Sequence, residues 1–408
     1  MQRYCAKMDS YSAREMFEQL SRPVYGRQLI YLDNAATSLR PKKILEEFVE
    51  NSVGYNANLH RAVHHYASVA TEKYENTRNL IHQFIGSAYA DEIVFTSGTT
   101  ASINLVAFSL GELLIHPGDE ILVGDDSHHS NILPWQMLCE RKGARLRHFD
   151  PLVPVGQSLT PKTKIVAVSH ISNVLGLVNP VKEIVSACHA KGIPVLVDGA
   201  QGIVHEKVDV KDLDCDFYAF SGHKMYAVPG TGVLYGKREW LEKMPPYMGG
   251  GEMIGTVSWD QSTFAPPPQK FEAGTQNFTG VFSFREAISV ANEMRCPEIE
   301  KEQLAIKEMV EFELRERMEG VTLHGGFGQP NRVPLFSFSV EGAHHEDIAL
   351  ILDKMGIAVR SGQMCAEPLM KKCGVTGMVR AAFAPYNTMS DAEHFISGLK
   401  KAVKMLRK

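Results

Sequence analysis

The sequence predicts an α/β fold, with a mainly parallel sheet in a large domain and a smaller α+β domain at the C-terminus. Three observations support this prediction. Short apolar runs alternate with longer amphipathic stretches from about Tyr31 to Gly236, as strands and crossover helices do. A glycine- and proline-rich passage over 245–275 then interrupts the alternation. The 408 residues also exceed what one hydrophobic core usually organises, so two domains are expected.

The first part of the chain contains a series of strand-like runs. In order they are "EIVFTS", "EILVGD", "RLRHFD", "KIVAVSH", "PVLVDG", "DFYAFS" and "GVLYG". Amphipathic stretches at 100–114 and 181–192 predict helices, and the second ends in a Lys-Gly pair typical of a helix C-terminus. The connector before "KIVAVSH" lacks a helix-like pattern. Ligands of α/β proteins bind at the carboxyl ends of strands, so polar residues after these runs are candidates for one site.

The passage over 245–275 predicts a long functional loop, because it keeps aromatic and charged residues. Trp259, Phe264 and Phe271 would be poorly justified on the surface of a monomer, so we expect this loop at the interface of a homodimer.

Helices and strands alternate again after this loop. The helix-like stretches are 281–294, 298–320 and the end of the chain from Ser390, and the strand-like runs are 334–340 and 358–362. We expect an N-terminal segment at 1–25 that packs near the small domain, a large domain at 26–293 and a small C-terminal domain at 294–408.

Composition argues against several classes of protein. The formal charge is −4, with 43 basic against 47 acidic residues and no long basic block, so nucleic acid is not an expected partner. No segment approaches eighteen apolar residues in a row, and the first twenty residues lack an apolar signal region, so we expect a cytoplasmic protein without a membrane partner. Seven cysteines without a CxxC pair argue against a disulfide framework and a metal site.

Two residues at strand ends suggest a cofactor. Asp198 ends the run "PVLVD", and Lys224 follows the run "DFYAF". For a lone Asp in this position, capping of the next helix is the commoner role. Together, however, a carboxylate and a lysine on neighbouring strand ends match pyridoxal phosphate chemistry, in which Asp pairs with the pyridinium nitrogen and Lys forms the Schiff base. The same lysine then serves as general base at the substrate Cα.

A pyridoxal phosphate site also needs an anion cup and contacts to the ring. In "TSGTTASINL", Thr99 and Thr100 begin a predicted helix whose N–H groups and dipole favour a phosphate. Ser221 and His223 flank the lysine and are further phosphate candidates. Other strand-end residues remain for the ring: His128 or His129 to stack on it, and Asn173 and Gln201 to donate to its phenolic oxygen.

Cys365 differs from the other cysteines. Cys139 and Cys188 fall on helical stretches and Cys215 leads into a strand, so buried inert thiols are expected there. Cys365 follows a strand end in "VRSGQMCAEPL", with Arg360 nearby to favour its thiolate.

Arg380 lies fifteen residues after Cys365 and offers a planar fork suited to an amino-acid carboxylate. A surface ion pair is the alternative for Arg380. We expect Arg380, Arg360 and Asn173 to bind substrate.

These motifs also resemble a known family. In order from about Tyr31 to Asn387, the chain contains "YLDNAATS", "GTT", "HHSNILPWQ", "HISNVLG", "VDGAQ", "DCDFYAFSGHKMYAVPGTGVLYG", "GGGEMI", "FEAGT" and "VRSGQMCAEP". They resemble the Suf-type cysteine desulfurases, within the class V aminotransferase family of fold-type I pyridoxal phosphate enzymes. The resemblance covers nearly the whole chain, and the lysine and cysteine motifs occur together at the expected positions.

The resemblance implies a role for each candidate. Lys224 is the Schiff-base lysine, His128 stacks on the ring and Cys365 receives sulfur as a persulfide. Thr275 would reach across the homodimer interface to the partner's phosphate. The remaining expected cofactor contacts are Asp198 at the pyridine nitrogen, Gln201 and Asn173 near the phenolic oxygen, and Thr99, Thr100, Ser221 and His223 at the phosphate.

The implied activity converts L-cysteine to L-alanine, with a thiol-bearing protein as sulfur acceptor and iron–sulfur cluster assembly as destination. L-selenocysteine is a further candidate substrate. One alternative is another class V reaction, such as that of a kynureninase-like lyase or an aminotransferase, which needs no catalytic cysteine. Another is a non-catalytic scaffold, which would purify colourless because it lacks the cofactor.

The chain departs from the family at three places. Gln363 and Met364 replace two usual histidines before the cysteine, Ala101 replaces an acidic residue, and Ser127 replaces a glutamate.

Overall fold

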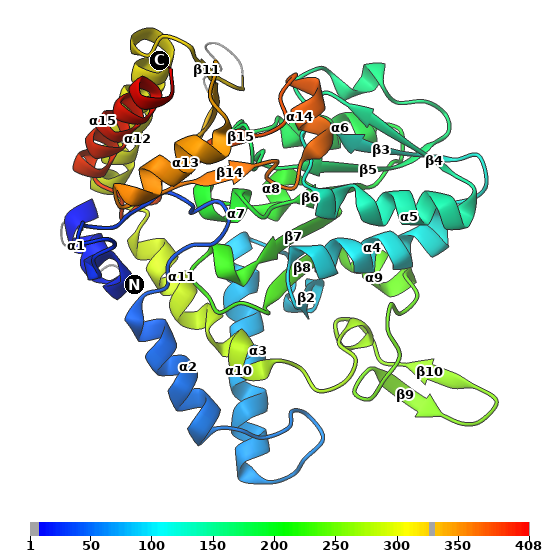
Figure 1. Ribbon diagram of the computed structural model, residues 1–408. Helices are drawn as coiled ribbons and strands as arrows, with labels where there is room; N and C mark the ends of the chain where they lie inside the picture. The colour runs from blue at the N-terminus through cyan, green and yellow to red at the C-terminus, as the bar shows by residue number, and fades with distance from the viewer. Residues whose placement is uncertain (1–7, 326–330, 408) are drawn as a thin grey trace. The chain divides into compact units, whose positions relative to one another are not determined.

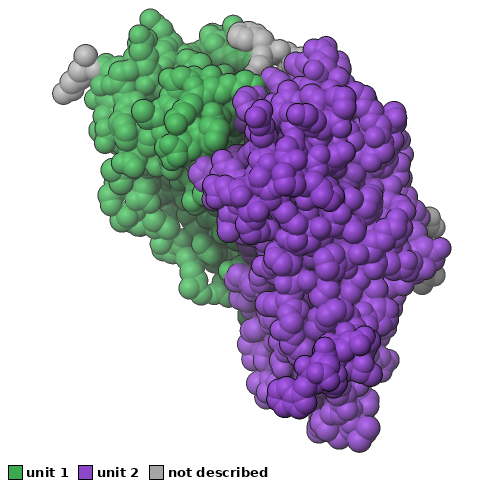
Figure 2. Space-filling view, turned by 90° about the vertical axis from the view of Figure 1, so that its right-hand side faces the viewer, with its two compact units in different colours: residues 1–43, 171–178, 289–408 green, residues 44–170, 179–288 purple. Residues whose placement is uncertain are grey.

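The computed structural model describes residues 8–325 and 331–407. The chain divides into two compact units, coloured separately in Figure 2. Unit 1 contains residues 1–43, 171–178 and 289–408, and unit 2 contains residues 44–170 and 179–288. Unit 1 therefore combines both ends of the chain with a short central segment. The expected division into an N-terminal segment at 1–25, a large domain at 26–293 and a small domain at 294–408 stays a prediction.

Unit 2 is built on a seven-stranded sheet with the order β2-β8-β7-β6-β5-β3-β4 (Figure 1). Its strands are β2 (Ile93–Thr96), β3 (Glu120–Gly124), β4 (Arg145–Phe149), β5 (Thr163–Ser169), β6 (Val195–Asp198), β7 (Phe217–Ser221) and β8 (Gly232–Gly236). Each of the seven strand-like runs in the first part of the sequence forms one of these strands. Only β8 runs antiparallel to its neighbours, so the prediction of a mainly parallel sheet is confirmed.

Helices cover this sheet because its strands are apolar on both faces. On one face, α4 (Thr99–Leu114) and α5 (Leu133–Lys142) lie side by side (Figure 1), and Leu110 and Trp135 join a core with β-strand residues such as Ile165. The opposite face meets aromatic side chains, including Tyr74 of α3 (His65–Ile85). The other helices of unit 2 are α6 (Val181–His189), α7 (Gly202–His205), α8 (Val210–Leu213), α9 (Arg238–Lys243) and α10 (Phe278–Phe282).

Two helices cross the boundary between the units, α2 (Lys42–Gly54) and α11 (Phe284–Glu293). The stretch 281–294, expected as one helix, is divided between α10 and α11 at Ser283. A three-residue 3₁₀ turn at Val155–Gln157 lies in the connector before β5, where no helix was expected.

The passage over 245–275 is a loop that contains a hairpin of β9 (Ile254–Val257) and β10 (Ser262–Phe264), which the sequence did not predict. Trp259 at the tip is fully exposed and Phe264 is half-exposed. Phe271 is different: it is 6% exposed and belongs to the core of unit 2, so the expectation that it lies on the surface of the monomer is wrong. The chain around Phe271 is fixed by the buried neighbour Glu272, which binds the Arg78 guanidinium through both oxygens at 2.8 and 2.9 Å.

Unit 1 contains a four-stranded antiparallel sheet with the order β11-β12-β15-β14. Its strands are β11 (Val321–Leu323), β12 (Leu335–Val340), β14 (Arg360–Gly362) and β15 (Met378–Ala382), and a separate parallel pair joins β1 (Ile30–Tyr31) to β13 (Ile357–Ala358). Its helices are α1 (Ser10–Glu15), α12 (Pro297–Phe312), α13 (His345–Lys354), α14 (Glu367–Lys372) and α15 (Met389–Leu406). Apolar residues of α12, α13 and α15 form one core with β12 and β15, which confirms the expected smaller α+β part.

Four cysteines are buried, and burial raises the pKa of Cys139 to about 11 and of Cys188 to about 12. This confirms the inert positions expected from the sequence. Cys373 is partly exposed, and Cys5 lies outside the described residues. Within residues 8–325 and 331–407, no helix combines the length and apolar character required to cross a membrane.

Candidate functional site

Strand pairing brings distant polar residues to one edge of the unit 2 sheet. Ser169 at the end of β5 lies opposite Asp198 at the end of β6. Gly232, the first residue of β8, pairs with both Ser221 at the end of β7 and Thr96 at the end of β2. The candidate residues after β2, β6 and β7 therefore share this edge because of the register alone.

The N-terminus of α4 and the end of β7 form a small polar cup. Gly98 precedes α4 with a φ of 151°, and as the N-cap residue it offers no side chain to cap this helix end. The Thr99 backbone N–H donates to Ser221 Oγ at 2.8 Å, and the two hydroxyl oxygens are also 2.8 Å apart. A Cβ atom at Gly98 would lie 3.2 Å from Ser221 Oγ, and one at Gly232 would lie 2.3 Å from Gly98 Cα. Both glycines are therefore needed for this close approach, and the helix dipole favours an anion there.

Asp198 is buried at the carboxyl end of β6, where its Oδ1 accepts a hydrogen bond from the Ala200 N–H at 3.0 Å. Burial raises the pKa of Asp198, while the positive charge of Lys224 opposes this shift. Lys224 is half-buried in a 3₁₀ turn, Gly222–Lys224, directly after β7. The pair is therefore close enough to interact electrostatically, and a cationic ring N–H beside Asp198 would hold the carboxylate in its ionised form.

His128 is half-buried after β3, and its ring orientation is set by the backbone. Its Nδ1 accepts a hydrogen bond from the Ser130 N–H at 3.0 Å, so a neutral His128 carries its proton on Nε2. The second candidate, His129, is also half-buried, with its ring centroid 6.3 Å from that of His128. Thr100 is exposed, and its hydroxyl oxygen lies 2.7 Å from Ser130 Oγ.

The remaining unit 2 candidates differ in exposure. Gln201 is buried at the start of α7, three residues after Asp198. His223 is half-buried between Ser221 and Lys224. Thr275 is exposed at the end of the loop that contains the β9–β10 hairpin. An exposed Thr275 is available to a second chain.

Asp126 is a buried acid near this site that sequence reasoning missed. Its Oδ2 accepts a hydrogen bond from Asn179 Nδ2 at 2.9 Å, and the same amide donates to the Ser169 carbonyl at 2.8 Å. Its Oδ1 has no hydrogen-bond partner among the described residues. Burial raises the pKa of Asp126 to about 7, against the effect of the Asn179 hydrogen bond. Asp126 precedes His128 by two residues. Its position directly after a predicted strand could have identified it as a site candidate from the sequence.

The substrate candidates of the sequence lie in unit 1, with Arg380 on β15 at their centre. Arg380 is 2% exposed, and its Nη1 donates to the Asn173 carbonyl at 2.8 Å. Its Nη2 lies 3.3 Å from Asp33 Oδ1, while its Nε has no hydrogen-bond partner among the described residues. Burial lowers the pKa of Arg380, and Asp33 opposes the shift. A buried guanidinium with an unsatisfied N–H group is suited to receive a carboxylate.

Cys365 is exposed on a loop that the same residues support. The backbone has a positive φ at Gly362 (106°), Met364 (53°) and Cys365 (55°). Asn173 Nδ2 donates to the Met364 carbonyl at 2.9 Å, so Asn173 fixes both this loop and Arg380. The Met364 side chain is buried in an apolar cluster, whereas Gln363 is exposed. Met364 therefore anchors the loop by packing where the family usually has a histidine.

The candidates thus form two groups, each described within its own unit. Unit 2 brings together Thr99, Asp198, Ser221 and Lys224, and unit 1 brings together Asn173, Arg360, Cys365 and Arg380. Asn173 was expected from the sequence to contact both cofactor and substrate, and both roles stay predictions; within unit 1 its side-chain amide contacts the Cys365 loop. Asp33, the acid beside Arg380, was not identified as a site residue from the sequence.

The strand-end acid, the adjacent lysine and the glycine-lined anion cup fit pyridoxal phosphate. The glycines keep Cβ atoms out of the cup, where a phosphate would bind, and a cationic ring nitrogen would offset the burial of Asp198. The fold and this site are those of a fold-type I pyridoxal phosphate enzyme.

Comparisons with known proteins agree. The chain matches the Aminotransferase class-V family over residues 30–395. It is 43% identical over 401 residues to a probable cysteine desulfurase from Halalkalibacterium halodurans, covering 97% of this chain and 98% of that protein. The crystal structure of the cysteine desulfurase CsdA from Escherichia coli aligns with a TM-score of 0.89 and 36% identity, covering 98% of this chain and 100% of that one. A cysteine desulfurase from Thermococcus onnurineus NA1 aligns with a TM-score of 0.88 and 37% identity, covering 95% and 98% of the two chains.

The chain therefore belongs to the class V aminotransferase family, within its group of cysteine desulfurases. Its cofactor is pyridoxal 5'-phosphate.

Proposed function

We propose that this enzyme converts L-cysteine to L-alanine and retains the sulfur as a persulfide on Cys365. One observation carries the proposal: the exposed Cys365 acts electrostatically on the buried Arg380, whose Nε–H lacks a partner among the described residues. An amino-acid carboxylate bound at Arg380 would satisfy that N–H group and hold its substrate near a free thiol. A class V lyase or aminotransferase has no need of such a thiol.

The residues of unit 2 bind the cofactor and move one proton. When bound, pyridoxal phosphate withdraws electrons from the substrate Cα. Asp198 would keep the ring nitrogen protonated, and the cup of Thr99 and Ser221 would hold the phosphate. Lys224 would anchor the cofactor covalently, and its amine would take the proton from the substrate Cα and return it to Cα when alanine forms. His128, with its proton on Nε2, would pack against the ring.

The residues of unit 1 bind the substrate and accept sulfur. Arg380 binds the carboxylate, and Asn173 holds the guanidinium and the Cys365 loop in place. The Cys365 thiolate then attacks the substrate sulfur: a new S–S bond forms, the Cβ–S bond breaks, and the bonding electrons and a proton go to Cβ. The products are alanine and a persulfide, so no external oxidant or reductant is consumed.

A direct test compares two cysteine variants. Cys365→Ser should still bind pyridoxal phosphate and L-cysteine but form no persulfide, with alanine production at least about 100-fold lower. Cys373→Ser, which alters the other thiol that is not fully buried among the described residues, should retain wild-type activity. Mass spectrometry of the Cys365 peptide after incubation with L-cysteine should show one added sulfur. Wild-type alanine production by Cys365→Ser would exclude the mechanism.

We also propose that the persulfide passes to a thiol-bearing acceptor protein and serves iron–sulfur cluster assembly in the cytoplasm, and that L-selenocysteine is a further substrate. The structure of the loop supports an acceptor that enters the site. Strand β14 ends at Gly362 and α14 begins at Glu367, so only residues 363–366 separate them. A loop this short cannot carry the thiol far.

The expected kinetics follow from this short loop. Rapid-quench measurements should show a burst of one alanine per active site, followed by slow steady-state turnover that a reductant or a thiol-bearing acceptor protein accelerates. The burst would arise because persulfide removal is slower than its formation. A linear time course that is indifferent to thiols would place the slow step before sulfur transfer and refute this expectation.

A further inference from the structure

We propose that Asp33 determines substrate specificity by excluding amino acids that carry a second negative charge. This inference rests on the proposed function, because it takes Arg380 as the carboxylate-binding residue. Asp33 lies within unit 1 between two arginines: its Oδ1 is 3.3 Å from Arg380 Nη2 and its Oδ2 is 3.5 Å from Arg360 Nη1. The Asp33 side chain is 22% exposed, between the buried Arg380 at 3% and the open Arg360 at 45%.

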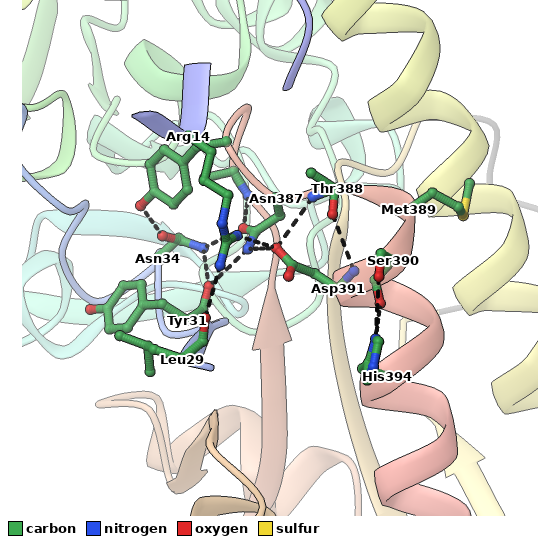
Figure 3. Close-up of polar contacts among 12 residues, drawn as sticks. Arg14, Leu29, Tyr31, Asn34, Asn387, Thr388, Met389, Ser390, Asp391 and His394 are labelled. Atoms are coloured by element: carbon green, nitrogen blue, oxygen red, sulfur yellow. Dashed lines mark hydrogen bonds and ion pairs between the residues drawn. The ribbon is translucent and has the colours of Figure 1, made fainter. Parts of the chain in front are cut away.

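The backbone around Asp33 is fixed to the strand that carries Arg380. Asp33 pairs with Ala382 in a parallel bridge, two residues beyond Arg380. The next residue, Asn34, donates through Nδ2 to the Ala382 carbonyl at 2.6 Å and to Asn387 Oδ1 at 3.1 Å, the latter drawn in Figure 3. The Asp33 carboxylate is therefore held in place by the fold and is not a mobile surface charge.

Asn387 is itself held by a buried acid. Its Nδ2 donates to Asp391 Oδ2 at 3.1 Å, and the same oxygen accepts from Arg14 Nη1 at 2.8 Å (Figure 3). Arg14 also donates to the Leu29 carbonyl at 3.0 Å, so the segment that leads to Asp33 is fixed at both of its ends. A change at the Asp33 carboxylate alone leaves this network intact.

The electrostatics explain how Asp33 discriminates. The charges of Asp33 and Cys365 both act on Arg380, so a substrate held between Arg380 and the thiol stays within the range of Asp33. The pKa of the neighbouring Tyr31 hydroxyl is raised by burial and by the charge of Asp33, and it is lowered by the charges of Arg360, Arg40 and Arg380. Arg380 and Arg360 alone would favour any polyanion. A single fixed carboxylate among them leaves room for one substrate carboxylate and repels a second.

Two isosteric probes isolate this effect, because L-aspartate and L-asparagine differ by one negative charge. Their inhibition constants are measured against L-cysteine in the alanine-forming assay. In the wild type, L-aspartate should bind at least about fivefold more weakly than L-asparagine. Asp33→Asn should lower the inhibition constant of L-aspartate about tenfold relative to that of L-asparagine, reversing the preference. Asp33→Glu keeps the charge and should keep the wild-type order.

Control variants separate the possible failures. Glu18→Gln removes the carboxylate of an exposed ion pair between a glutamate and an arginine in unit 1. It should leave both inhibition constants unchanged. If Arg380→Ala leaves the KM for L-cysteine unchanged, the carboxylate site lies elsewhere, and both the proposed site and this inference fall. If Arg380→Ala raises that KM while Asp33→Asn leaves the aspartate-to-asparagine ratio unchanged, only the role of Asp33 is overturned.

Discussion

Met364 and Cys365 adopt left-handed backbone conformations that side chains normally avoid, at a cost of about 1 kcal/mol or more for each residue. The surroundings of the loop offset this cost. The Met364 side chain is buried among apolar neighbours, and its carbonyl accepts the Asn173 amide. The adjacent Cys365 is exposed.

Asp126 is the residue with the clearest pH effect, because burial raises the pKa of its carboxyl from 3.8 to about 7. Between about pH 4 and pH 7, the unfolded chain loses a proton that the folded protein keeps, so the free energy of unfolding falls as the pH rises. The fall amounts to at most about 1.4 kcal/mol per pH unit, and above pH 7 the contribution is constant.

Asp126→Asn should remove this slope, because asparagine does not titrate and still accepts the hydrogen bond of Asn179. Urea unfolding of both proteins should show that the variant gains stability over the wild type as the pH rises from about 4.5 to 7.5. Asp353→Asn, at a partly exposed carboxylate, is the matched control and should show no such trend. A pH-independent difference between Asp126→Asn and wild type would mean that Asp126 is ionised throughout this range.

Helix α4 contributes to the site through its N-terminus, where glycine is needed for two reasons. The φ of 151° at Gly98 is rarely adopted by side-chain-bearing residues, and an added Cβ would approach Ser221 Oγ within 3.2 Å. The approach to Ser221 Oγ would disturb the phosphate cup directly. The cup therefore depends on backbone geometry that only a few positions of the chain provide.

Gly98→Ala should weaken pyridoxal phosphate binding by about tenfold or more, because it strains the backbone and displaces Ser221 from the cup. Titration of the apoprotein with the cofactor, followed by absorbance, measures this effect. Gly118→Ala is the matched control: Gly118 also has a positive φ, of 85°, but nothing lies within 4 Å of the added Cβ. Equal cofactor affinity of the two variants would show that the cup does not bind the phosphate.

Most strands of unit 2 could be predicted because they are continuous apolar runs bounded by turn residues, and all seven expected strands formed. The β9–β10 hairpin could not, since its strands are short and mostly exposed and mix apolar with polar residues without a regular hydrophobic pattern. The strand-end positions of Asp198, Ser221 and Lys224 were likewise accessible from sequence. The position of Asp33 beside Arg380 was not, because their contact joins residues 347 positions apart and depends on the pairing of the N-terminal segment with β15.

At the scale of the whole molecule, the exposed hairpin indicates a second copy of the chain. Val257, Trp259 and Phe264 are 62%, 104% and 48% exposed, and an isolated two-stranded hairpin is marginally stable in water. We propose that a homodimer covers this hairpin and that the exposed Thr275 completes the partner's phosphate site. Cofactor affinity should then depend on dimerisation.

The double variant Trp259→Ser, Phe264→Ser should therefore weaken the dimer and, with it, cofactor retention. We expect light scattering to detect monomers at concentrations where the wild type is dimeric, because the two aromatic side chains supply much of the apolar area that the hairpin offers a partner. Activity of the variant should fall on dilution and recover at high protein concentration or with excess pyridoxal phosphate. Met137→Ser, at a residue of α5 that is 55% exposed, should change neither property. A double variant that is monomeric yet fully active and retains its cofactor would refute the contribution of Thr275, and one that remains dimeric at every concentration would place the interface on another surface.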